Sequence, residues 1–301
     1  MKMLTGFDYV APRSLGELFS LMRQYGGEAR VLAGGTDLLV AMKEKELKAR
    51  YLIDIKEIPD FTGISYSTPQ GLKMGALSTI HSIETSQVTS ENFPTLCEAA
   101  SQLGSYQVRH RATLGGNLCN ASPAADMATP LMALDAKLNV VGENGERTIP
   151  IEQFFVGPGK TALGSGELLK CVSVSTTTPQ TGCNYIKLGR RRAMDCAIVN
   201  VAVSLTMESS NGSCRTARIA LGSVAPTPLR AVEAENTLKN QKISEDLIVK
   251  AALAAQHAAK PISDVRASAD YRFKMTRVVV TRALTNAYHM AQEGMRGGRT
   301  R

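Results

Sequence analysis

Hydrophobic positions divide the start of the chain into short strands and a helix. The stretch ARVLAGGTDLL (29–39) begins as an apolar strand that breaks at Gly34 and Gly35, and DLLVAMKEKEL (37–47) then has helical periodicity. YLIDI (51–55) predicts a second strand. We therefore expect a β-α-β unit at the beginning of the chain.

Local signals for helix starts and turns define the next part of the chain. Two predicted strands bound it, at residues 71–75 and 167–175. Between them a helix is expected from about Thr79, and Pro94 suits the first turn of another helix that runs to Leu103. Asn144 and Gly145 form the dipeptide that is typical of a hairpin turn.

A linker-like stretch, TTTPQTGCN (176–184), separates these elements from a different pattern. Three apolar stretches then predict antiparallel strands, namely YIKLGRRR (185–192), CAIVNVAVSLTME (196–208) and CRTARIALGSVAP (214–226). Three helices are expected after them, at residues 228–240, 244–259 with Ser244 as N-cap, and 269–292. The pattern predicts an α+β protein that ends in a three-stranded antiparallel sheet with helices.

Composition places the chain among ordinary globular proteins. Its 301 residues exceed the usual size of one domain, so two or three domains are expected. The apolar stretches are shorter than the ~20 residues of a membrane span, and the first residues, MKMLTGFDYV, lack the apolar core of a secretory signal. These features predict a cytoplasmic protein without a membrane span.

Charge and the metal-binding residue types exclude several classes of function. None of the six cysteines forms a Cys-x-x-Cys pair and the four histidines are scattered, so we expect free thiols and no zinc or iron–sulfur site. The net charge of +8 is dispersed and has few aromatic neighbours, which disfavours nucleic-acid binding. A basic surface that attracts an anionic cofactor or an acidic partner fits the charge better.

The common nucleotide-binding and hydrolytic motifs are missing from the sequence. GPGKT (157–161) resembles half of a P-loop, but Phe154 stands where the upstream glycine is required. There is also no Gly-x-Gly-x-x-Gly, Gly-x-Ser-x-Gly or His-Glu-x-x-His sequence. Hydrolytic enzymes of the usual kinds are therefore disfavoured.

Two glycine-rich turns carry the chemistry that the residues themselves indicate. AGGTD (33–37) follows a strand and opens a helix, and TLGGN (113–117) follows a basic turn. Paired glycines let consecutive backbone N–H groups point into one concavity, and a helix start adds unpaired donors. Thr36 and Thr113 add hydroxyl groups, and Asn117 can hydrogen-bond locally. Facing each other, the two turns would bind a diphosphate.

Four longer stretches extend this interpretation to a known family. They are LAGGTDLLVAMK (32–43), ATLGGNLCNASPAADMATPLMALDA (112–136), FFVGPGKTAL (154–163) and RIALGSVAPTPLRAVEAE (218–235). Together they resemble the FAD-binding subunit of molybdenum hydroxylases. That family includes the medium subunit of carbon monoxide dehydrogenase and the flavin subunit or domain of xanthine dehydrogenases. The similarity extends over roughly residues 1–290, with the motifs in the family order.

The resemblance implies a domain organisation. Residues 1–177 would form a two-part FAD-binding domain of the vanillyl-alcohol-oxidase or PCMH type, with subdomains at about 1–58 and 59–177. Residues 182–290 would form a C-terminal domain like that of the carbon monoxide dehydrogenase flavoprotein, and 291–301 a flexible basic tail.

The resemblance also implies which residues contact FAD. The first pyrophosphate loop would consist of Val31, Leu32, Ala33, Gly34, Gly35, Thr36, Asp37 and Leu38, and the second would include Thr113, Gly115, Gly116 and Asn117. Ser122 and Asp126 match positions that reach polar parts of the flavin, whereas Leu103 and Leu169 match apolar positions around it. Lys187 matches a lysine near the flavin, where a cation would favour the anionic reduced form.

Several of these positions have an ordinary structural alternative. Asp126 could cap a helix that starts near Met127, Lys187 could be a charge on a strand surface, and the two leucines could be core residues. RRRAMD (190–195) is either a solvated loop or, as in relatives, a stretch that passes the flavin ring and affects which acceptor reaches it. Cys119 stands at an apolar position of the family, which indicates packing.

The family's division of labour implies an oxidoreductase subunit within a heterotrimer. A large molybdopterin-binding subunit would oxidise the substrate, with water as the oxygen source. Two [2Fe–2S] clusters in a small subunit would pass single electrons to non-covalently bound FAD, which can give two electrons as hydride. NAD is the expected acceptor, with ferredoxin, quinone or oxygen as alternatives. The molybdenum cofactor and the clusters would reside only in the partners.

Two other functions remain open at this point. A stand-alone FAD-dependent oxidoreductase would need a substrate-binding cap with acid–base residues, and the C-terminal part supplies little of that. Neighbouring genes for molybdopterin and iron–sulfur subunits would distinguish the two cases. A flavin-free assembly subunit is disfavoured by the intact glycine turns. The substrate of the complex is not indicated by the sequence.

Overall fold

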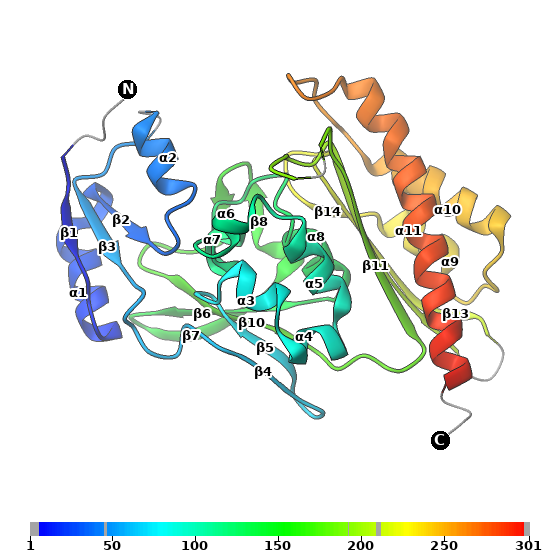
Figure 1. The fold of residues 1–301 in the computed structure, drawn as a ribbon, viewed down its shortest axis with the longest axis horizontal. Helices are drawn as coiled ribbons and strands as arrows, with labels where there is room; N and C mark the ends of the chain where they lie inside the picture. The colour runs from blue at the N-terminus through cyan, green and yellow to red at the C-terminus, as the bar shows by residue number, and fades with distance from the viewer. Residues whose placement is uncertain (1–5, 45–46, 192, 209–211, 298–301) are drawn as a thin grey trace.

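A small parallel sheet begins the chain. The computed structural model describes residues 6–44, 47–191, 193–208 and 212–297. The first lobe has strands in the order β1-β3-β2, and it comprises β1 (Asp8–Val10), α1 (Leu15–Tyr25), the 3-10 turn η1 (Gly26–Glu28), β2 (Ala29–Leu32), α2 (Leu38–Lys43) and β3 (Tyr51–Asp54). The predicted β-α-β unit is therefore preceded by one more strand and helix, and Figure 1 shows this lobe at the left.

The second lobe is an antiparallel sheet covered by short helices (Figure 1). Its strands follow the order β4 (Ile64–Ser67), β5 (Gly71–Gly75), β10 (Leu168–Val174), β6 (Lys137–Gly142) and β7 (Gly145–Pro150). The helices between β5 and β6 are α3 (Ile80–Glu84), α4 (Gln87–Asn92), α5 (Pro94–Ser101), α6 (Tyr106–Arg109), α7 (Leu114–Cys119) and α8 (Ala128–Ala133). The 3-10 turn η2 (Ile151–Gln153) and a hairpin of β8 (Phe155–Gly157) and β9 (Lys160–Thr161) complete it.

The C-terminal part is an antiparallel sheet with three helices on one face. The sheet has the order β11 (Thr181–Leu188), β12 (Val199–Met207), β13 (Cys214–Gly222) and β14 (Leu229–Arg230), and the helices are α9 (Val232–Leu238), α10 (Glu245–Ala258) and α11 (Ala269–Gly297). The α+β architecture is confirmed, but the sheet has four strands where the sequence predicts three. The extra strand, β14, is two residues long, too short to give a hydrophobic pattern.

The C-terminal sheet separates two hydrophobic cores. Tyr185, Ala202 and Ala220 lie in register across β11, β12 and β13, and they belong to the core of the second lobe. Val203 and Ile219, on the opposite face, belong to a core shared with α9, α10 and α11. Ala202 and Ala220 are small, and this lets α8 pack closely on β12 and β13.

Helix α11 extends further than the sequence predicts. It continues to Gly297, so residues 291–297 of the expected tail are helical, while 298–301 lie outside the described residues. Ala291 is buried, and a Cβ at Gly294 would lie 1.9 Å from the carbonyl oxygen of Pro179. Close packing against the segment before β11 therefore stabilises the end of this helix.

Charged side chains connect the second lobe to the C-terminal sheet. Arg230 donates to Asp135 at 2.9 Å and also bonds Glu152, both in the second lobe, and it pairs with Glu235 at the start of α9. Arg230 and Glu235 are 9% and 7% exposed, whereas Arg218, which also binds Asp135, is 35% exposed. Arg230 is thus the buried centre of this network.

In the described part of the chain, no helix has the length and apolarity needed to cross a bilayer.

Replacing Arg230 tests how strongly this network holds the two parts together. Arg230→Met leaves the Glu235 carboxylate buried without its cation, so we expect the free energy of unfolding to fall by about 3 kcal/mol. Urea unfolding at neutral pH measures the change. Arg218→Met is the matched control, and its loss should stay below about 1 kcal/mol because Arg218 is partly exposed. Equal losses for the two variants would contradict this assignment.

Candidate functional site

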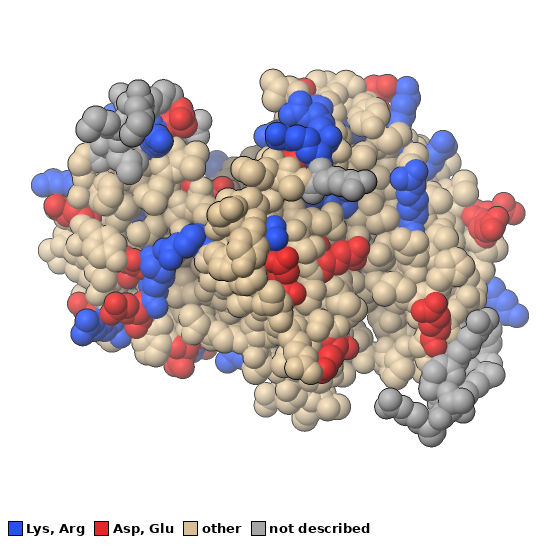
Figure 2. Space-filling model, in the orientation of Figure 1, with Lys and Arg blue, Asp and Glu red and all other residues tan. Residues whose placement is uncertain are grey.

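A cleft of about 610 Å³ lies where the first and second lobes meet. The loop after β2 and helix α2 form one wall, and α6, α7 and the segment that leads into α8 form the other. Met194, Asp195 and Cys196, which connect β11 to β12, line it as well. The space-filling view is indented at its upper edge, to the right of α2 (Figure 2).

The first glycine turn supplies free backbone donors to this cleft. Gly34, Gly35 and Thr36 line it, and their N–H groups have no acceptor among the described residues. A Cβ at Gly34 would lie 2.0 Å from the carbonyl oxygen of Arg111, so only glycine lets this loop touch the segment before the second turn. Gly35 has φ +77°, which also favours glycine. The loop is therefore a concave set of unpaired donors, a typical anion site.

The second glycine turn differs from the sequence expectation because the N–H groups of residues 114–117 already have acceptors within the protein. Thr113 is the N-cap of α7, and its hydroxyl accepts the N–H of Gly116 at 3.0 Å. The N–H of Gly115 donates to Ala76 at 2.7 Å, and a Cβ at Gly115 would lie 2.8 Å from the Ala76 side chain. Asn117 is helical and accepts the N–H of Met127. This turn gives a close-packed wall rather than a second set of free donors.

A buried ion pair stands behind the opposite end of the cleft. The Lys187 ammonium donates to Asp126 at 2.8 Å and to the carbonyl oxygen of Gln102 at 2.9 Å. The two charged side chains are 6% and 9% exposed, so Lys187 is not a charge on a strand surface. Asp126 does not cap α8 either, because the N-cap of α8 is Met127 and makes no side-chain bond. Both structural alternatives for these residues are therefore wrong.

Tyr185 and Glu98 complete the surroundings of this pair. The Tyr185 hydroxyl donates to Asp126 at 2.8 Å, and its backbone N–H bonds the Glu98 carboxylate. Burial raises the pKa of Asp126, while Lys187 opposes part of that effect. Burial and the Asp126 charge raise the pKa of Tyr185 well above its usual value, so the phenol keeps its proton at neutral pH. Burial likewise raises the pKa of Glu98.

The segment between β11 and β12 folds over the cleft. Asp195 accepts the N–H groups of Arg190 and Arg191 at 2.5 and 3.0 Å, and these bonds lower the pKa of Asp195 although burial acts against them. Met194, at φ +52°, donates its N–H to the carbonyl oxygen of Gly104. Arg192 lies outside the described residues. Among the described residues of RRRAMD, Met194 and Asp195 are therefore held at the cleft by hydrogen bonds, whereas Arg190 and Arg191 are exposed.

Most of the positions selected from the sequence meet in this cleft. Those that line it are Val31, Ala33, Gly34, Gly35, Thr36, Asp37, Leu38, Leu103, Thr113, Gly116, Asn117, Ser122 and Asp126. Four others do not, namely Leu32, Gly115, Leu169 and Lys187. Leu32 and Leu169 are buried core residues, and Lys187 reaches the cleft only through Asp126.

Other lining residues were not singled out from the sequence. They include Ser105, Val108, Asn120, Ala124 and Ala125. Ser105 is the N-cap of α6, so its cap signal could have placed it near the glycine turn. Cys119 also lines the cleft, and burial raises the pKa of its thiol to about 12, which fits a packing role.

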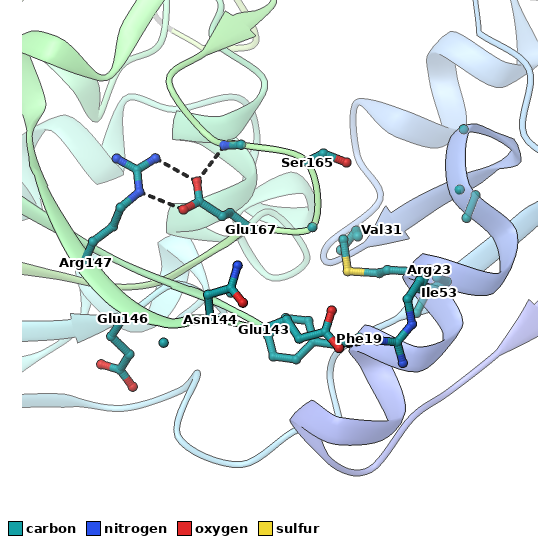
Figure 3. Close-up of a pocket in the computed structure, with 18 residues that line it drawn as sticks. Phe19, Arg23, Val31, Ile53, Glu143, Asn144, Glu146, Arg147, Ser165 and Glu167 are labelled. Atoms are coloured by element: carbon teal, nitrogen blue, oxygen red, sulfur yellow. Dashed lines mark hydrogen bonds and ion pairs between the residues drawn. The ribbon is translucent and has the colours of Figure 1, made fainter.

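A second pocket of about 640 Å³ adjoins the first along β2 (Figure 3). Val31 lines both pockets, and Phe19 and Ile53 extend its apolar wall. The opposite wall carries Glu167, which accepts two bonds from Arg147 at 2.7 Å, and this pairing lowers the pKa of Glu167 to about 2. This pocket combines an apolar side with a charged, hydrogen-bonding side.

Metal binding finds no support in the described side chains. Within residues 6–44, 47–191, 193–208 and 212–297, no group of three or more His, Cys, Asp or Glu side chains could hold a metal ion. The cleft instead offers backbone donors at one end and a buried carboxylate with its lysine at the other.

Comparison with known proteins matches both halves of the chain. Residues 5–176 match the family described as FAD binding domain in molybdopterin dehydrogenase, and residues 184–287 match the CO dehydrogenase flavoprotein C-terminal domain. The chain is 35% identical to the carbon monoxide dehydrogenase medium chain of Hydrogenophaga pseudoflava, over 94% of this chain and 97% of that protein.

Two further comparisons agree with this match. The xanthine dehydrogenase FAD-binding subunit of Escherichia coli O157:H7 is 31% identical, over 86% of this chain and 89% of that protein. A solved carbon monoxide dehydrogenase from Hydrogenophaga pseudoflava superposes with a TM-score of 0.92 at 35% identity, covering 96% of this chain and 99% of the matched chain.

We expect removal of Lys187 from the buried pair to lower the free energy of unfolding by an amount that depends on pH. Lys187→Met leaves the Asp126 carboxylate buried without its cation, so the flavin-free chain should lose about 3 kcal/mol of unfolding free energy at about pH 8. In this variant the pKa of Asp126 is higher in the folded than in the unfolded chain. Protonation therefore favours the folded state, and the loss should shrink as the pH falls to about 5.

Urea unfolding across this pH range measures the effect. Lys170→Met is the control, since Lys170 pairs with the exposed Glu146 on another surface, and its smaller loss should not vary in this way. Adding Asp126→Asn to Lys187→Met should restore stability at the higher pH. A Lys187→Met loss that stays constant from pH 5 to 8 would argue against a buried, unpaired carboxylate.

Proposed function

We propose that this chain, which belongs to the family of FAD-binding subunits of molybdenum hydroxylases, passes electrons from [2Fe–2S] clusters of a partner subunit to a diffusible acceptor. It is an oxidoreductase subunit, and its cofactor is FAD. The observation that carries the proposal is the set of free N–H groups at Gly34, Gly35 and Thr36, which face a cleft closed at its other end by a buried carboxylate.

The first glycine turn would hold the diphosphate of FAD. Its three unpaired N–H groups satisfy phosphate oxygens without adding charge, and the Thr36 side chain adds a hydroxyl group to the same wall. Gly116 faces them across the cleft, and a Cβ there would meet only the Thr113 hydroxyl. The second turn would therefore form a narrow wall beside the diphosphate, whereas its bonded N–H groups would not bind the phosphate oxygens.

The far end of the cleft suits the flavin ring and its ribityl chain. Leu103 and Val108 provide apolar contacts, whereas Ser122 and Asp126 provide polar ones. Each Asp126 oxygen already accepts one hydrogen bond and can accept another, so this carboxylate can bind a hydroxyl or a ring N–H group. Lys187 contributes its charge through Asp126.

The second pocket would receive the adenosine half of the cofactor. It adjoins the cleft at Val31, and its apolar wall of Phe19, Val31 and Ile53 suits a purine ring. Leu169 lies two residues after Glu167, a lining residue of this pocket. Leu169 itself lines neither pocket, so its proposed contact with FAD rests on the family resemblance.

FAD supplies a redox centre that can accept electrons one at a time and release them as a pair. The chain's own residues bind it, exclude water and set the local charge.

We propose that the clusters and the molybdenum cofactor reside in partner subunits, that FAD is held non-covalently and that NAD is the acceptor. The proposed domains are those expected from the sequence, with limits at 1–177 and 182–290. A cytoplasmic location is also proposed.

Substitution of Gly116 tests the diphosphate site. Gly116→Val should reduce the flavin content of the purified chain at least tenfold, because the new side chain enters the cleft without meeting protein backbone. The visible flavin spectrum, followed by acid release and identification of FAD, measures occupancy. Gly16→Val is the matched control, since Gly16 is exposed on α1 and a Cβ there meets nothing within 4 Å. Wild-type flavin content in Gly116→Val would refute the site.

The proposed acceptor can be tested in the reverse direction. If NAD is the acceptor, NADH should bleach the visible flavin band of the isolated chain under anaerobic conditions, because hydride transfer is reversible. Dithionite provides the full reduction for comparison. Bleaching by dithionite but not by NADH would exclude NAD and favour ferredoxin, quinone or oxygen, without affecting the FAD site.

A further inference from the structure

The Asp126–Lys187 pair lies between two cavities that also meet at Asp195. Asp126 lines the flavin cleft, whereas Lys187 lines a pocket of about 470 Å³ on its other side. The remaining lining residues of that pocket are Gln102, Leu188, Gly189, Arg190, Arg191, Ala193 and Asp195. Because Arg190 and Arg191 are exposed, this pocket connects to solvent. A 2.8 Å hydrogen bond between two buried groups therefore joins a residue that lines the cleft to a residue that lines the solvent-connected pocket.

One proton-bearing neighbour of Asp126 also lines the pocket. The Tyr185 hydroxyl donates to Asp126 too, but Tyr185 lines neither cavity, and the Gln102 carbonyl carries no proton. Lys187 is an ammonium group that can release a proton, which a guanidinium cannot do. Moving that proton to Asp126 turns a buried ion pair into a neutral pair, and burial lowers the energetic cost of this change relative to water.

The other charged groups around the pair are compatible with proton entry from the pocket. Glu98, on α5, bonds the Tyr185 N–H and does not line the pocket. The Asp195 carboxylate is held by the N–H groups of Arg190 and Arg191, and these bonds keep its pKa low. Among the pocket's described residues, Lys187 is thus the only one that is hydrogen-bonded to Asp126.

We propose that Asp126 and Lys187 form a proton relay from this pocket to the flavin cleft. The proposal rests on the proposed function, since reduction of FAD consumes protons. A Lys187 N–H proton first passes to the Asp126 carboxylate, and the carboxyl O–H bond formed there then breaks as its proton goes to the reduced cofactor, which restores the carboxylate. A hydronium ion or buffer acid in the pocket then protonates the Lys187 amine. One proton moves inward and this chain's residues transfer no electrons.

The test follows proton uptake in the FAD-loaded full chain. Light-driven anaerobic reduction in weak buffer, with a pH-indicator dye, records flavin reduction and proton uptake in the same sample. Wild-type protein should take up protons as fast as it is reduced. Lys187→Arg keeps the charge but cannot pass a proton, so uptake should lag about 100-fold. Lys170→Met, on a different surface, is the control and should behave as wild type.

Chemical rescue separates a proton relay from a purely electrostatic role. In Lys187→Ala, methylammonium can enter through the pocket and should restore uptake, whereas tetramethylammonium has the same charge but no proton to give. The relay is refuted if Lys187→Arg takes up protons at the wild-type rate, or if methylammonium restores Lys187→Ala no better than tetramethylammonium. A wild-type chain that retains no FAD would instead refute the proposed function.

Discussion

Helix α8 is held at both ends by carboxylates that pair with cations of the C-terminal sheet. Asp126 precedes the helix and binds Lys187 of β11, and Asp135 follows it and binds Arg230 of β14. All six residues of α8 are buried, and the helix contacts β12, β13 and β14. A buried helix of this length gains little from its own backbone hydrogen bonds. Its position is therefore fixed by packing and by the two ion pairs, and the cleft wall that carries Asp126 depends on both.

The two glycine turns look alike in sequence but contribute differently to the cleft. At the first turn, glycine allows contact with the Arg111 carbonyl, and the N–H groups of Gly34, Gly35 and Thr36 have no acceptor among the residues that the structure describes. At the second, Thr113 caps α7 and Gly115 packs on Ala76, so the amides are satisfied within the protein. One turn therefore offers hydrogen-bond donors and the other offers a rigid, narrow wall, and an anionic cofactor between them needs both properties.

The sequence predicts features that depend on neighbouring residues. Thr79 and Ser244 are N-caps, Pro94 begins α5, and the hairpin of β6 and β7 turns at Glu143 and Asn144, one residue before the predicted pair Asn144 and Gly145. Each signal acts over a few residues, so it survives without tertiary information. Strand β1 is three residues long and two of them are exposed, so it leaves no hydrophobic pattern. Family resemblance placed Asp126 and Lys187 near the flavin. Their direct contact across 61 positions follows only from the packing of α8 on the sheet.

The burial of Lys187 has a consequence for how the two halves of the chain work together. A lone buried ammonium would be costly, and it is tolerated here because Asp126 and the Gln102 carbonyl accept its hydrogen bonds. Both acceptors belong to the second lobe, whereas the lysine belongs to the C-terminal sheet. The sheet therefore places a charge behind the flavin cleft that the second lobe alone lacks. Any movement of the sheet away from α8 would expose or unpair that charge, so the electrostatics of the cleft are coupled to the docking of the C-terminal part.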